Sequence, residues 1–228
     1  MSDLVSVIIP AYNAAKYLGG AIDSVARQTH DLVEIIVVDD ASTDDTAGVA
    51  APYRNALRYV VQPHRGHAAA RNHGVRISRG RYLAFLDADD LWEPDKLAVQ
   101  LAAFDADPSL DIIFGHVIQF WSPELSLPPA ASVANVGEPM RGDHPGAMLV
   151  TRTAFDKIGP FREDQEIGNF VDWYARALDD DCRILMLGSV VMRRRLHQTN
   201  MGRGTTSGPE EYARALRRVV DRRRGRKG

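Results

Sequence analysis

Short apolar runs alternate with helical patterns along the first part of the chain, and this alternation constrains the fold more than any other feature. The runs VSVIIP, VEIIVVDD and RYLAFL are rich in β-branched and other apolar residues, which is typical of strands buried on both faces. Such strands, separated by helices, predict an α/β fold with a mostly parallel central sheet flanked by helices. The expected strands cover 5–10, 33–40, 57–62 and 81–86, and the expected helices cover 14–29, 42–51 and 66–78.

Three of these strands end in polar or aromatic residues. The ends read PAYN at 10–13, VVDDAST at 37–43 and LDADD at 86–90. In open sheets of this kind, ligands bind beyond the carboxyl ends of the strands. We therefore expect aromatic, amide and carboxylate groups to gather at one edge of the sheet and to form a binding site there.

The last of these strand ends carries three carboxylates, Asp87, Asp89 and Asp90. If the chain stays extended past Leu86, the side chains of Asp87 and Asp89 project to one side and that of Asp90 to the other. Converging carboxylates repel one another unless something neutralises them, and their hard oxygen atoms suit Mg²⁺ or Mn²⁺. The alternative is an acidic turn that caps the helix expected near Pro94, a role that fits Asp90.

The charge balance and the cysteine content exclude several classes of protein. The chain has 30 acidic and 28 basic residues and a net charge of -2, so nothing in the balance requires a nucleic-acid partner. The single cysteine, Cys182, rules out an intrachain disulfide. No apolar run approaches the ~20 residues that span a bilayer. The N-terminus lacks the basic region and long apolar core of a signal peptide, so the expected location is cytoplasmic, with any membrane contact peripheral.

The second half of the chain has a looser pattern. A segment rich in proline and glycine, 122–146, has no clear periodicity, and loops of that length are usually functional or mobile. We expect one domain over 1–205 and a basic tail at 206–228. The expected helices here are 93–107 and 169–180, and the expected strands are 111–121, 147–151, 182–187 and 189–197.

The tail has an amphipathic helical pattern. Tyr212, Leu216, Val219 and Val220 fall on one helical face, and arginines dominate the rest. Such a helix either docks on anionic lipid as a peripheral membrane contact or packs on its own domain with a solvated basic end. Packing on the domain is the commoner behaviour.

Four motifs in order connect these features to a known family. They are VSVIIPAYNAAKYLGGAIDSVARQT, EIIVVDDASTDDT, GHAAARNHGV and GRYLAFLDADDLWEPDKL. Together they resemble glycosyltransferase family 2, the inverting nucleotide-sugar transferases with the GT-A fold. The resemblance implies a single Rossmann-like nucleotide-binding domain. Residues 1–119 would bind the nucleotide sugar and the metal, and a smaller portion at 120–205 would bind the acceptor.

The resemblance gives the strand-end residues specific roles. Tyr12 is expected to stack against a uracil ring, and Asp40 to accept the hydrogen of uracil N3, for which a carboxylate is a suitable acceptor. Arg71 is expected near the diphosphate, which a guanidinium can bind bidentately. Without the resemblance, Tyr12 reads as a core aromatic and Arg71 as a solvated helix charge. Asp40 then reads as part of a helix-capping cluster with Ser42 and Asp44. The implied nucleotide-binding set is Pro10, Tyr12, Asn13, Asp40, Arg71, Asp87 and Ala88.

The same resemblance assigns the metal residues. Asp87 and Asp89 match the family's D-x-D element, whose carboxylates hold Mn²⁺ or Mg²⁺ against the substrate phosphates. The ion would stabilise the departing nucleoside diphosphate as a Lewis acid. His197 is the third expected metal residue, as a ligand or a phosphate contact, and its alternative is a structural histidine.

The catalytic base is predicted from one stretch, GNFVDWYARA. The family often places its base in an acidic pair shortly before an aromatic residue and an arginine, but here Asn169 and Phe170 stand at the position of the pair. Asp172 is the only acid in the stretch and lies near the start of an expected helix, where a carboxylate is favoured. Asp172 is therefore predicted as the base, and its alternative is a helix N-terminal acid without chemistry. The substitutes in the preceding loop are Glu163, Asp164 and Glu166.

The predicted function is transfer of a sugar from a nucleotide donor, expected to be a UDP-sugar, to a hydroxyl acceptor that is a saccharide, a lipid-linked molecule or a peptide. This is an enzyme of the hexosyltransferase type. The sugar and the oligomeric state, a homodimer included, stay open. Phospho-acceptor receiver domains also gather acids at strand ends, but they are far shorter. A nucleotidyltransferase typically has a Gly- and basic-rich phosphate loop, which PAYNAAKYLGG supplies poorly. A non-catalytic sugar-nucleotide-binding protein is the remaining alternative.

Overall fold

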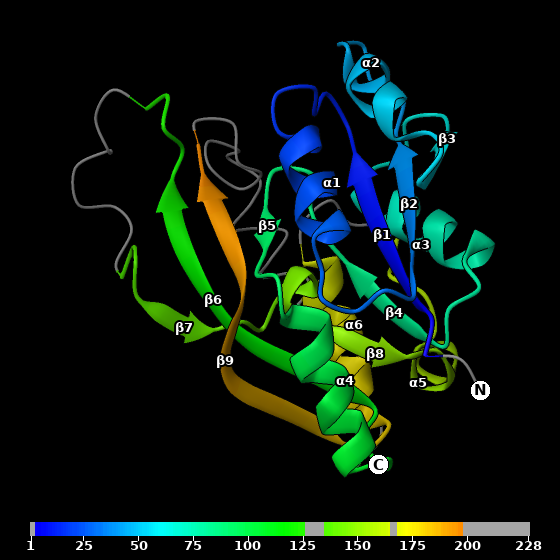
Figure 1. The fold of residues 1–228 in the computed structure, drawn as a ribbon. Coiled ribbons are helices and arrows are strands. Elements are labelled where there is room, and N and C mark those ends of the chain that lie inside the picture. Colours follow the sequence, from blue (N-terminus) through cyan, green and yellow to red (C-terminus); the bar gives the residue numbers. More distant parts are fainter. Residues whose placement is uncertain (1–2, 126–134, 165–167, 198–228) are drawn as a thin grey trace.

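The computed structural model describes residues 3–125, 135–164 and 168–197 (Figure 1). Within these ranges, a curled central sheet lies between two layers of helices. The strands are β1 (Val5–Ala11), β2 (Val33–Asp39), β3 (Leu57–Val61), β4 (Tyr82–Phe85), β5 (Leu91–Trp92), β6 (Ile112–Trp121), β7 (Pro139–Arg141), β8 (Leu149–Thr151) and β9 (Ile184–Leu196). The helices are α1 (Leu18–Ala26), α2 (Thr46–Ala50), α3 (His67–Ile77), α4 (Lys96–Ala106), α5 (Arg152–Ile158) and α6 (Asn169–Asp179), with 3₁₀ turns η1 (Ala51–Tyr53) and η2 (Pro145–Ala147).

The elements differ from the sequence expectations in several places. The helix expected at 42–51 is shortened to α2, because the Ser42 hydroxyl accepts a hydrogen bond from the backbone N–H of Asn13 (2.9 Å) and holds the preceding segment as a loop. Helix α5 is additional, and the Thr151 hydroxyl caps it by accepting a backbone N–H of the first turn. The segment 122–146 contains β7 and η2 in its described part.

The strand order is β3-β2-β1-β4-β8-β6-β9-β5, with β7 paired to β6. Strands β3, β2, β1 and β4 are parallel, as the sequence predicts. The other half of the sheet is mixed. Strand β8 runs antiparallel to β4 and β6, β9 runs parallel to β6, and β5 and β7 run antiparallel to their partners. The two strands expected at 182–187 and 189–197 form the single strand β9.

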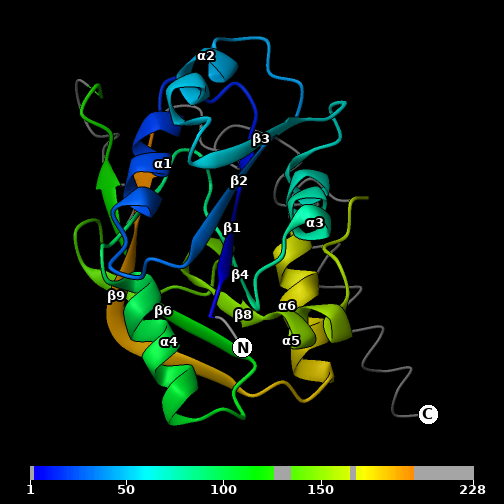
Figure 2. The ribbon, with the colours of Figure 1, turned by 45° about the vertical axis from the view of Figure 1, so that its right-hand side comes forward.

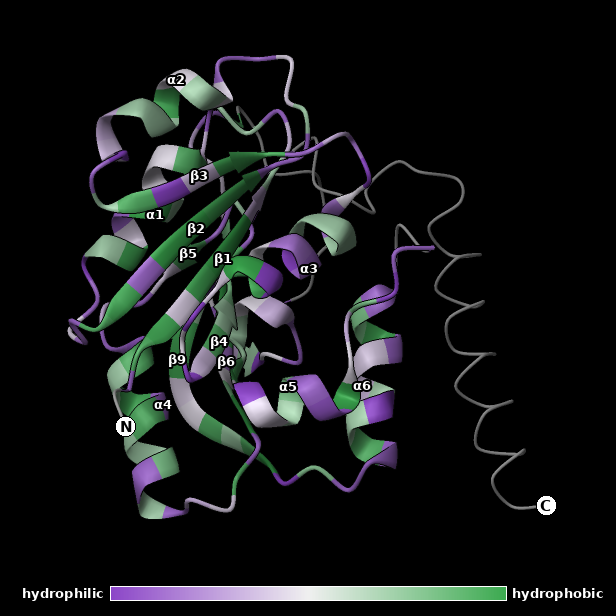
Figure 3. Cartoon of the chain, turned by 90° about the vertical axis from the view of Figure 1, so that its right-hand side faces the viewer, coloured by the Kyte–Doolittle hydropathy of each residue, from purple (hydrophilic) through white to green (hydrophobic). Residues whose placement is uncertain are grey.

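Helices cover both faces of the sheet (Figure 2): α1 and α4 lie on one face, and α3, α5 and α6 on the other. Alternate residues of β1 pack in the two hydrophobic cores, one on each face of the sheet. Val5, Val7 and Ile9 pack in the core beneath α1 and α4, and Ile8 packs in the core beneath α3. All four side chains are fully buried. The parallel strands are hydrophobic along most of their length (Figure 3) because both of their faces pack against helices.

Strand β9 brings the C-terminal half back to the carboxyl end of β4. Arg195 donates its backbone N–H to Asp90 Oδ1 (2.8 Å) and its guanidinium to the Asp89 carbonyl oxygen (2.9 Å). His197 follows directly and therefore reaches the acidic segment after β4. The boundary at residue 119 stays a prediction, and the tail at 206–228 lies outside the described residues.

None of the helices in the described ranges combines the length and the apolar character needed to cross a membrane.

Candidate active site

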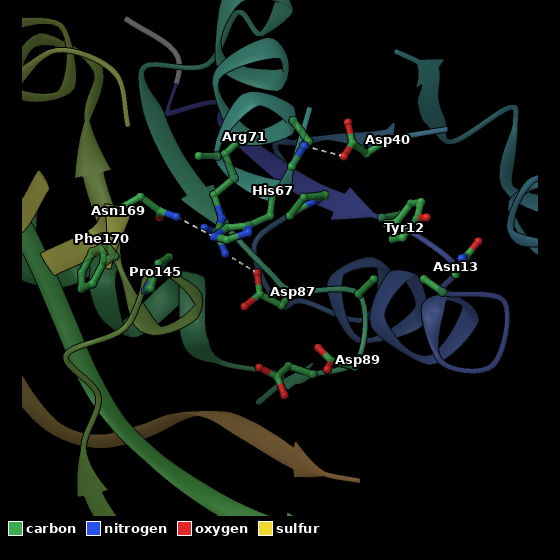
Figure 4. Close-up of a pocket in the computed structure, with 18 of the residues that line it drawn as sticks. Tyr12, Asn13, Asp40, His67, Arg71, Asp87, Asp89, Pro145, Asn169 and Phe170 are labelled. Carbon is green, nitrogen blue, oxygen red and sulfur yellow. Dashed lines mark hydrogen bonds and ion pairs between the residues drawn. The ribbon is translucent and has the colours of Figure 1, made fainter. Parts of the chain in front are cut away.

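A broad cleft of about 1440 Å³ opens at the carboxyl ends of β1, β2 and β4 (Figure 4). The loops after these strands form one part of its lining. The first turns of α3 and α6 and the end of β9 supply the other parts. All of the residues predicted to bind the nucleotide or the metal line the cleft: Pro10, Tyr12, Asn13, Asp40, Arg71, Asp87, Ala88, Asp89 and His197.

Tyr12 and Asn13 form the loop after β1. Tyr12 is 50% exposed and lines the cleft, so it is not a core aromatic. Asn13 has a left-handed φ of 48°, a conformation that asparagine tolerates better than most residues. Its Oδ1 accepts the backbone N–H of Thr43 (2.8 Å), and its own N–H donates to Ser42 Oγ. Asn13 thus joins the loops after β1 and β2 beside the exposed ring of Tyr12.

Asp40 is buried at the same end of the cleft, where it is surrounded by donors. Its Oδ1 accepts hydrogen bonds from Gln62 Nε2 (2.7 Å) and the Arg65 backbone N–H (2.9 Å). Its Oδ2 accepts the Gly66 backbone N–H (2.7 Å), and His64 Nδ1 lies 2.9 Å from the same oxygen. Asp40 therefore organises the segment between β3 and α3 rather than capping a helix.

Arg71 and Asp87 form an ion pair in the middle of the cleft, with 2.6 Å between Arg71 Nη2 and Asp87 Oδ1. Arg71 is buried, so it is not a solvated helix charge, and its Nε has no hydrogen-bond partner in the described part of the chain. Burial by itself raises the pKa of Asp87. The charge and the hydrogen bond of Arg71 outweigh burial and hold that pKa well below its usual range. Asp87 is therefore ionised at neutral pH.

The chain turns after Leu86 instead of staying extended, so the expectation of an extended segment through Asp89 is wrong. The Asp90 backbone N–H donates to the Asp87 carbonyl oxygen (3.0 Å) and closes the turn. Asp87 and Asp89 still line the cleft together, while the Asp90 side chain is buried and accepts the Arg195 N–H. Burial, followed by the charges of Asp89 and Asp87, raises the pKa of Asp90 well above its usual value.

Asp89 and His197 form the part of the cleft that suits a divalent cation. Asp89 Oδ2 and His197 Nε2 are 2.9 Å apart. Carboxylate oxygen and imidazole nitrogen are both ligands of Mn²⁺, and oxygen is the ligand that Mg²⁺ prefers. Within the described ranges, no group of three or more His, Cys, Asp or Glu side chains is arranged to hold a metal by itself. These two side chains supply two ligand atoms, so a cation held here would take its remaining ligands from water or from another bound molecule.

Two histidines that the sequence analysis did not single out also line the cleft near Asp87. His67 Nε2 lies 2.6 Å from Asn169 Nδ2. His144 accepts the Gly146 N–H at Nδ1 (3.0 Å), and its Nε2 lies 3.6 Å from Asp87 Oδ2. Burial lowers the pKa of each histidine to about 4, so both are neutral at pH 7. No spacing pattern marks His144, and only its place in the third motif marks His67.

Asp172 does not line the cleft. It is fully buried, and its Oδ2 accepts a hydrogen bond from Arg176 Nε (3.0 Å). Arg176 also donates to the carbonyl oxygens of Ile158 and Pro160. The Asp172–Arg176 pair thus connects α6 to the end of α5. Residues 168–171, just before Asp172, line the cleft. The assignment of Asp172 as the base stays a prediction.

The loop before α6 brings other carboxylates to the cleft wall. Glu163 lines the cleft, where Oε1 accepts from Asn72 Nδ2 (3.0 Å) and Oε2 lies 2.6 Å from Arg65 Nη2. Asp164 also lines the cleft. Glu166, the third substitute named from the sequence, lies outside the described residues.

The sheet, parallel in one half and mixed in the other, and the cleft at its carboxyl edge are those of the GT-A fold. Residues 6–159 match the sequence profile described as Glycosyl transferase family 2. The chain belongs to this family.

Similar proteins agree with this membership. An uncharacterized glycosyltransferase of Rickettsia typhi is 28% identical over 222 residues, which are 92% of this chain and 70% of the relative. An uncharacterized glycosyltransferase of Rickettsia felis is 42% identical over 114 residues, but the chain spans only 18% of that relative's length.

Two solved structures share the fold. TarS 1-349 of S. aureus in complex with UDP-GlcNAc has a TM-score of 0.74 at 21% identity, over 95% of this chain and 65% of that one. The mannosyltransferase PcManGT from Pyrobaculum calidifontis, in complex with GDP-Man and Mn²⁺, has a TM-score of 0.70 at 21% identity, over 93% of this chain and 64% of that one. At this identity, the likeness shows the fold alone.

Proposed function

We propose that this chain is a metal-dependent, inverting glycosyltransferase that moves a sugar from a UDP-sugar to a hydroxyl acceptor. One observation carries the proposal: a single cleft holds the exposed ring of Tyr12 and the Arg71–Asp87 ion pair (Figure 4), together with the Asp89–His197 pair. These three features suit the base, the diphosphate and the cation of one nucleotide-sugar complex.

Tyr12 and Asp40 form the nucleobase end of the proposed site. The half-exposed Tyr12 ring offers a face for stacking, and Asp40 offers carboxylate oxygens to the uracil N3 hydrogen. The choice of UDP depends on these roles, which come from the family resemblance. Of the two similar structures, TarS holds UDP-GlcNAc and the mannosyltransferase holds GDP-Man, so both types of donor belong in a test.

Asp89 and His197 would hold the cation, with Asp87 beside them. When bound, a divalent cation supplies Lewis-acid stabilisation of the charge on the leaving nucleoside diphosphate. Arg71 adds a fixed positive charge. Its buried Nε–H, which has no hydrogen-bond partner among the described residues, is a donor that a phosphate oxygen can use.

The proposed transfer is a single displacement. The acceptor hydroxyl oxygen bonds to the anomeric carbon on the face opposite the diphosphate, and the bond from that carbon to the diphosphate oxygen breaks. The hydroxyl proton passes to a base. One displacement inverts the configuration at the anomeric carbon.

Three carboxylates among the described residues are candidates for the base: Asp172, Glu163 and Asp164, of which Glu163 and Asp164 line the cleft. The sequence names Asp172, which reaches an acceptor only if its buried pair with Arg176 opens. Glu163 already lies on the cleft wall, where Asn72 and Arg65 hold its two oxygens. The geometry favours Glu163 over Asp172, because a base must come within hydrogen-bond reach of the proton that it accepts.

A non-catalytic nucleotide-sugar-binding protein is the second candidate. Asn169 and Phe170 stand where the family often carries an acidic pair, and both line the cleft. The Asn169 amide contacts His67. A chain with a complete donor site but no base would bind the nucleotide sugar without transferring the sugar.

A panel of nucleotide sugars separates these candidates. UDP-hexoses, UDP-N-acetylhexosamines and GDP-mannose are incubated with Mn²⁺, with and without EDTA, while nucleotide release and calorimetric binding are measured. We expect slow release of UDP from a UDP-sugar and loss of that release with EDTA. Binding without release on prolonged incubation supports the non-catalytic protein. Absence of binding for every nucleotide sugar overturns both candidates.

A further inference from the structure

The imidazole of His64 lies where a stacked nucleobase would lie. Its ring centroid is 4.3 Å from that of Tyr12, with 31° between the ring planes. His64 Nδ1 lies 2.9 Å from Asp40 Oδ2 and 3.1 Å from the Asp40 carbonyl oxygen. Because both neighbours of Nδ1 are acceptors, Nδ1 carries a hydrogen. The ring therefore covers Tyr12 and offers an N–H to Asp40, the two contacts expected of uracil.

Asp40 has its acceptor positions filled while His64 is in place. A carboxylate offers about four lone-pair sites, two on each oxygen. Gln62 and Arg65 donate to Oδ1, while Gly66 donates to Oδ2 and His64 faces it. Two of these donors are backbone N–H groups, and Gln62 is buried. The His64 side chain is 57% exposed, so of the four donors it can move away from Asp40 with the least change to the surrounding structure.

We propose that His64 is a gate of the nucleobase site, an inference that rests on the proposed function. Without donor, His64 covers Tyr12 and satisfies Asp40. Donor binding exchanges both contacts for those of the base, so His64 competes with every ligand that carries a stacking base. A ligand that contains only the diphosphate does not meet this competition, because it does not need the Tyr12 end of the cleft.

Substitution of His64 by alanine tests the gate. The Kd of UDP and of inorganic pyrophosphate is measured by calorimetry with Mn²⁺ for the wild type, His64→Ala and His30→Ala. His30 is a half-buried histidine outside the cleft lining, and its variant is the matched control. We expect UDP to bind His64→Ala roughly three- to tenfold more tightly, the factor that one typical net hydrogen bond supplies. Pyrophosphate should bind all three proteins alike.

Each other outcome has a definite meaning. Weaker or unchanged binding of UDP to His64→Ala overturns the gate, since weaker binding makes His64 a partner of the base. An equal gain for pyrophosphate overturns it as well, because the effect then does not involve the base. If the wild type binds no UDP, the proposed function itself fails, and that result is seen before any His64 variant is compared.

A second readout follows His64 directly in the wild-type protein. The NMR signal of its imidazole, assigned by its absence from the His64→Ala spectrum, should shift on addition of UDP and stay in place on addition of pyrophosphate. A signal that UDP leaves unmoved shows that the ring does not leave Tyr12, and this overturns the gate.

Discussion

At the scale of single residues, the charged groups of the cleft are paired with one another before any substrate binds. Arg71 pairs with Asp87, and Asp89 contacts His197. Substitution of one of these residues therefore also removes the charged partner of its neighbour. Because this can affect folding as well as a substrate contact, each variant is compared with a control variant.

We expect Asp89→Ala to remove metal-dependent activity without unfolding the protein. Asp89 is half-buried and supplies a carboxylate oxygen next to His197, so its loss should lower turnover with Mn²⁺ by roughly 10²-fold or more. Turnover and UDP affinity are measured over a Mn²⁺ titration. The control is Asp95→Ala, an exposed acid outside the cleft lining. Unchanged turnover of Asp89→Ala, or wild-type turnover that is indifferent to EDTA, contradicts the metal role.

The catalytic base is tested by two isosteric changes, Glu163→Gln and Asp172→Asn. We expect Glu163→Gln to lower transfer by the ~10²- to 10⁴-fold typical of a lost general base, with UDP binding retained. Asp172→Asn should instead lower the free energy of unfolding by about 1–3 kcal/mol, because Arg176 loses its buried charged partner. Single-turnover rates and urea denaturation distinguish the two effects. A folded Asp172→Asn protein that loses transfer by that factor supports the sequence prediction instead.

At the scale of elements, a glycine sets the distance between α3 and β1. A Cβ atom on Gly74 would lie 2.4 Å from Ile8 Cγ2 and 2.9 Å from Ile8 Cγ1. We expect Gly74→Ala to lower the free energy of unfolding by about 1–3 kcal/mol through overpacking, although alanine has the higher helix propensity. The shift of α3 should also weaken UDP binding, because this helix carries Arg71. Urea denaturation and calorimetry measure the two effects.

A second helical glycine provides the control for this change. A Cβ atom on Gly19 in α1 would meet Val49 Cγ1 at 3.6 Å, an ordinary contact. Gly19→Ala should therefore leave stability unchanged or raise it by up to about 1 kcal/mol. Equal stability of the Gly74 and Gly19 variants would show that α3 has room to move away from β1.

At the scale of the whole molecule, stability depends on a lysine inside the core. Lys96 is fully buried, with Nζ donating to Gln100 Oε1 (2.6 Å) and the Met148 carbonyl oxygen (3.2 Å), and it lies 4.3 Å from the centre of the Trp92 ring. Burial lowers the pKa of Lys96 well below the ordinary value of 10.5. The unfolded chain therefore binds this proton more strongly than the folded protein. The contribution of Lys96 to stability is complete above pH 10.5 and is lost as the pH falls toward the folded pKa.

The stability of the wild type relative to Lys96→Met should consequently rise with pH. Between pH 7.5 and pH 9.5 we expect a gain of up to about 1.4 kcal/mol per pH unit. Urea denaturation at both pH values measures it. Lys157→Met, at an exposed lysine, should show no such trend. A difference between wild type and Lys96→Met that does not change with pH would mean that Lys96 stays charged in the core.

The sequence by itself determined the parallel half of the sheet and the edge at which the site forms. Each run is apolar at successive positions, which indicates a strand that is covered on both faces. The strands, and the helices between them, can therefore be predicted from the local pattern of apolar residues. Parallel strands also end at a common edge, so Tyr12, Asp40 and Asp87 were predicted to meet there. All three line one cleft.

Only the tertiary structure decided how the second half completes the cleft. His197 lies beside Asp89, 108 positions away in the sequence, because β9 pairs with β5 and β6. Asp172 is directed into its pair with Arg176, and His64 covers Tyr12. Local periodicity places a residue on a strand, a helix or a loop. Which distant partner satisfies a buried or charged side chain depends on packing between elements, which the spacing of residues along the chain does not encode.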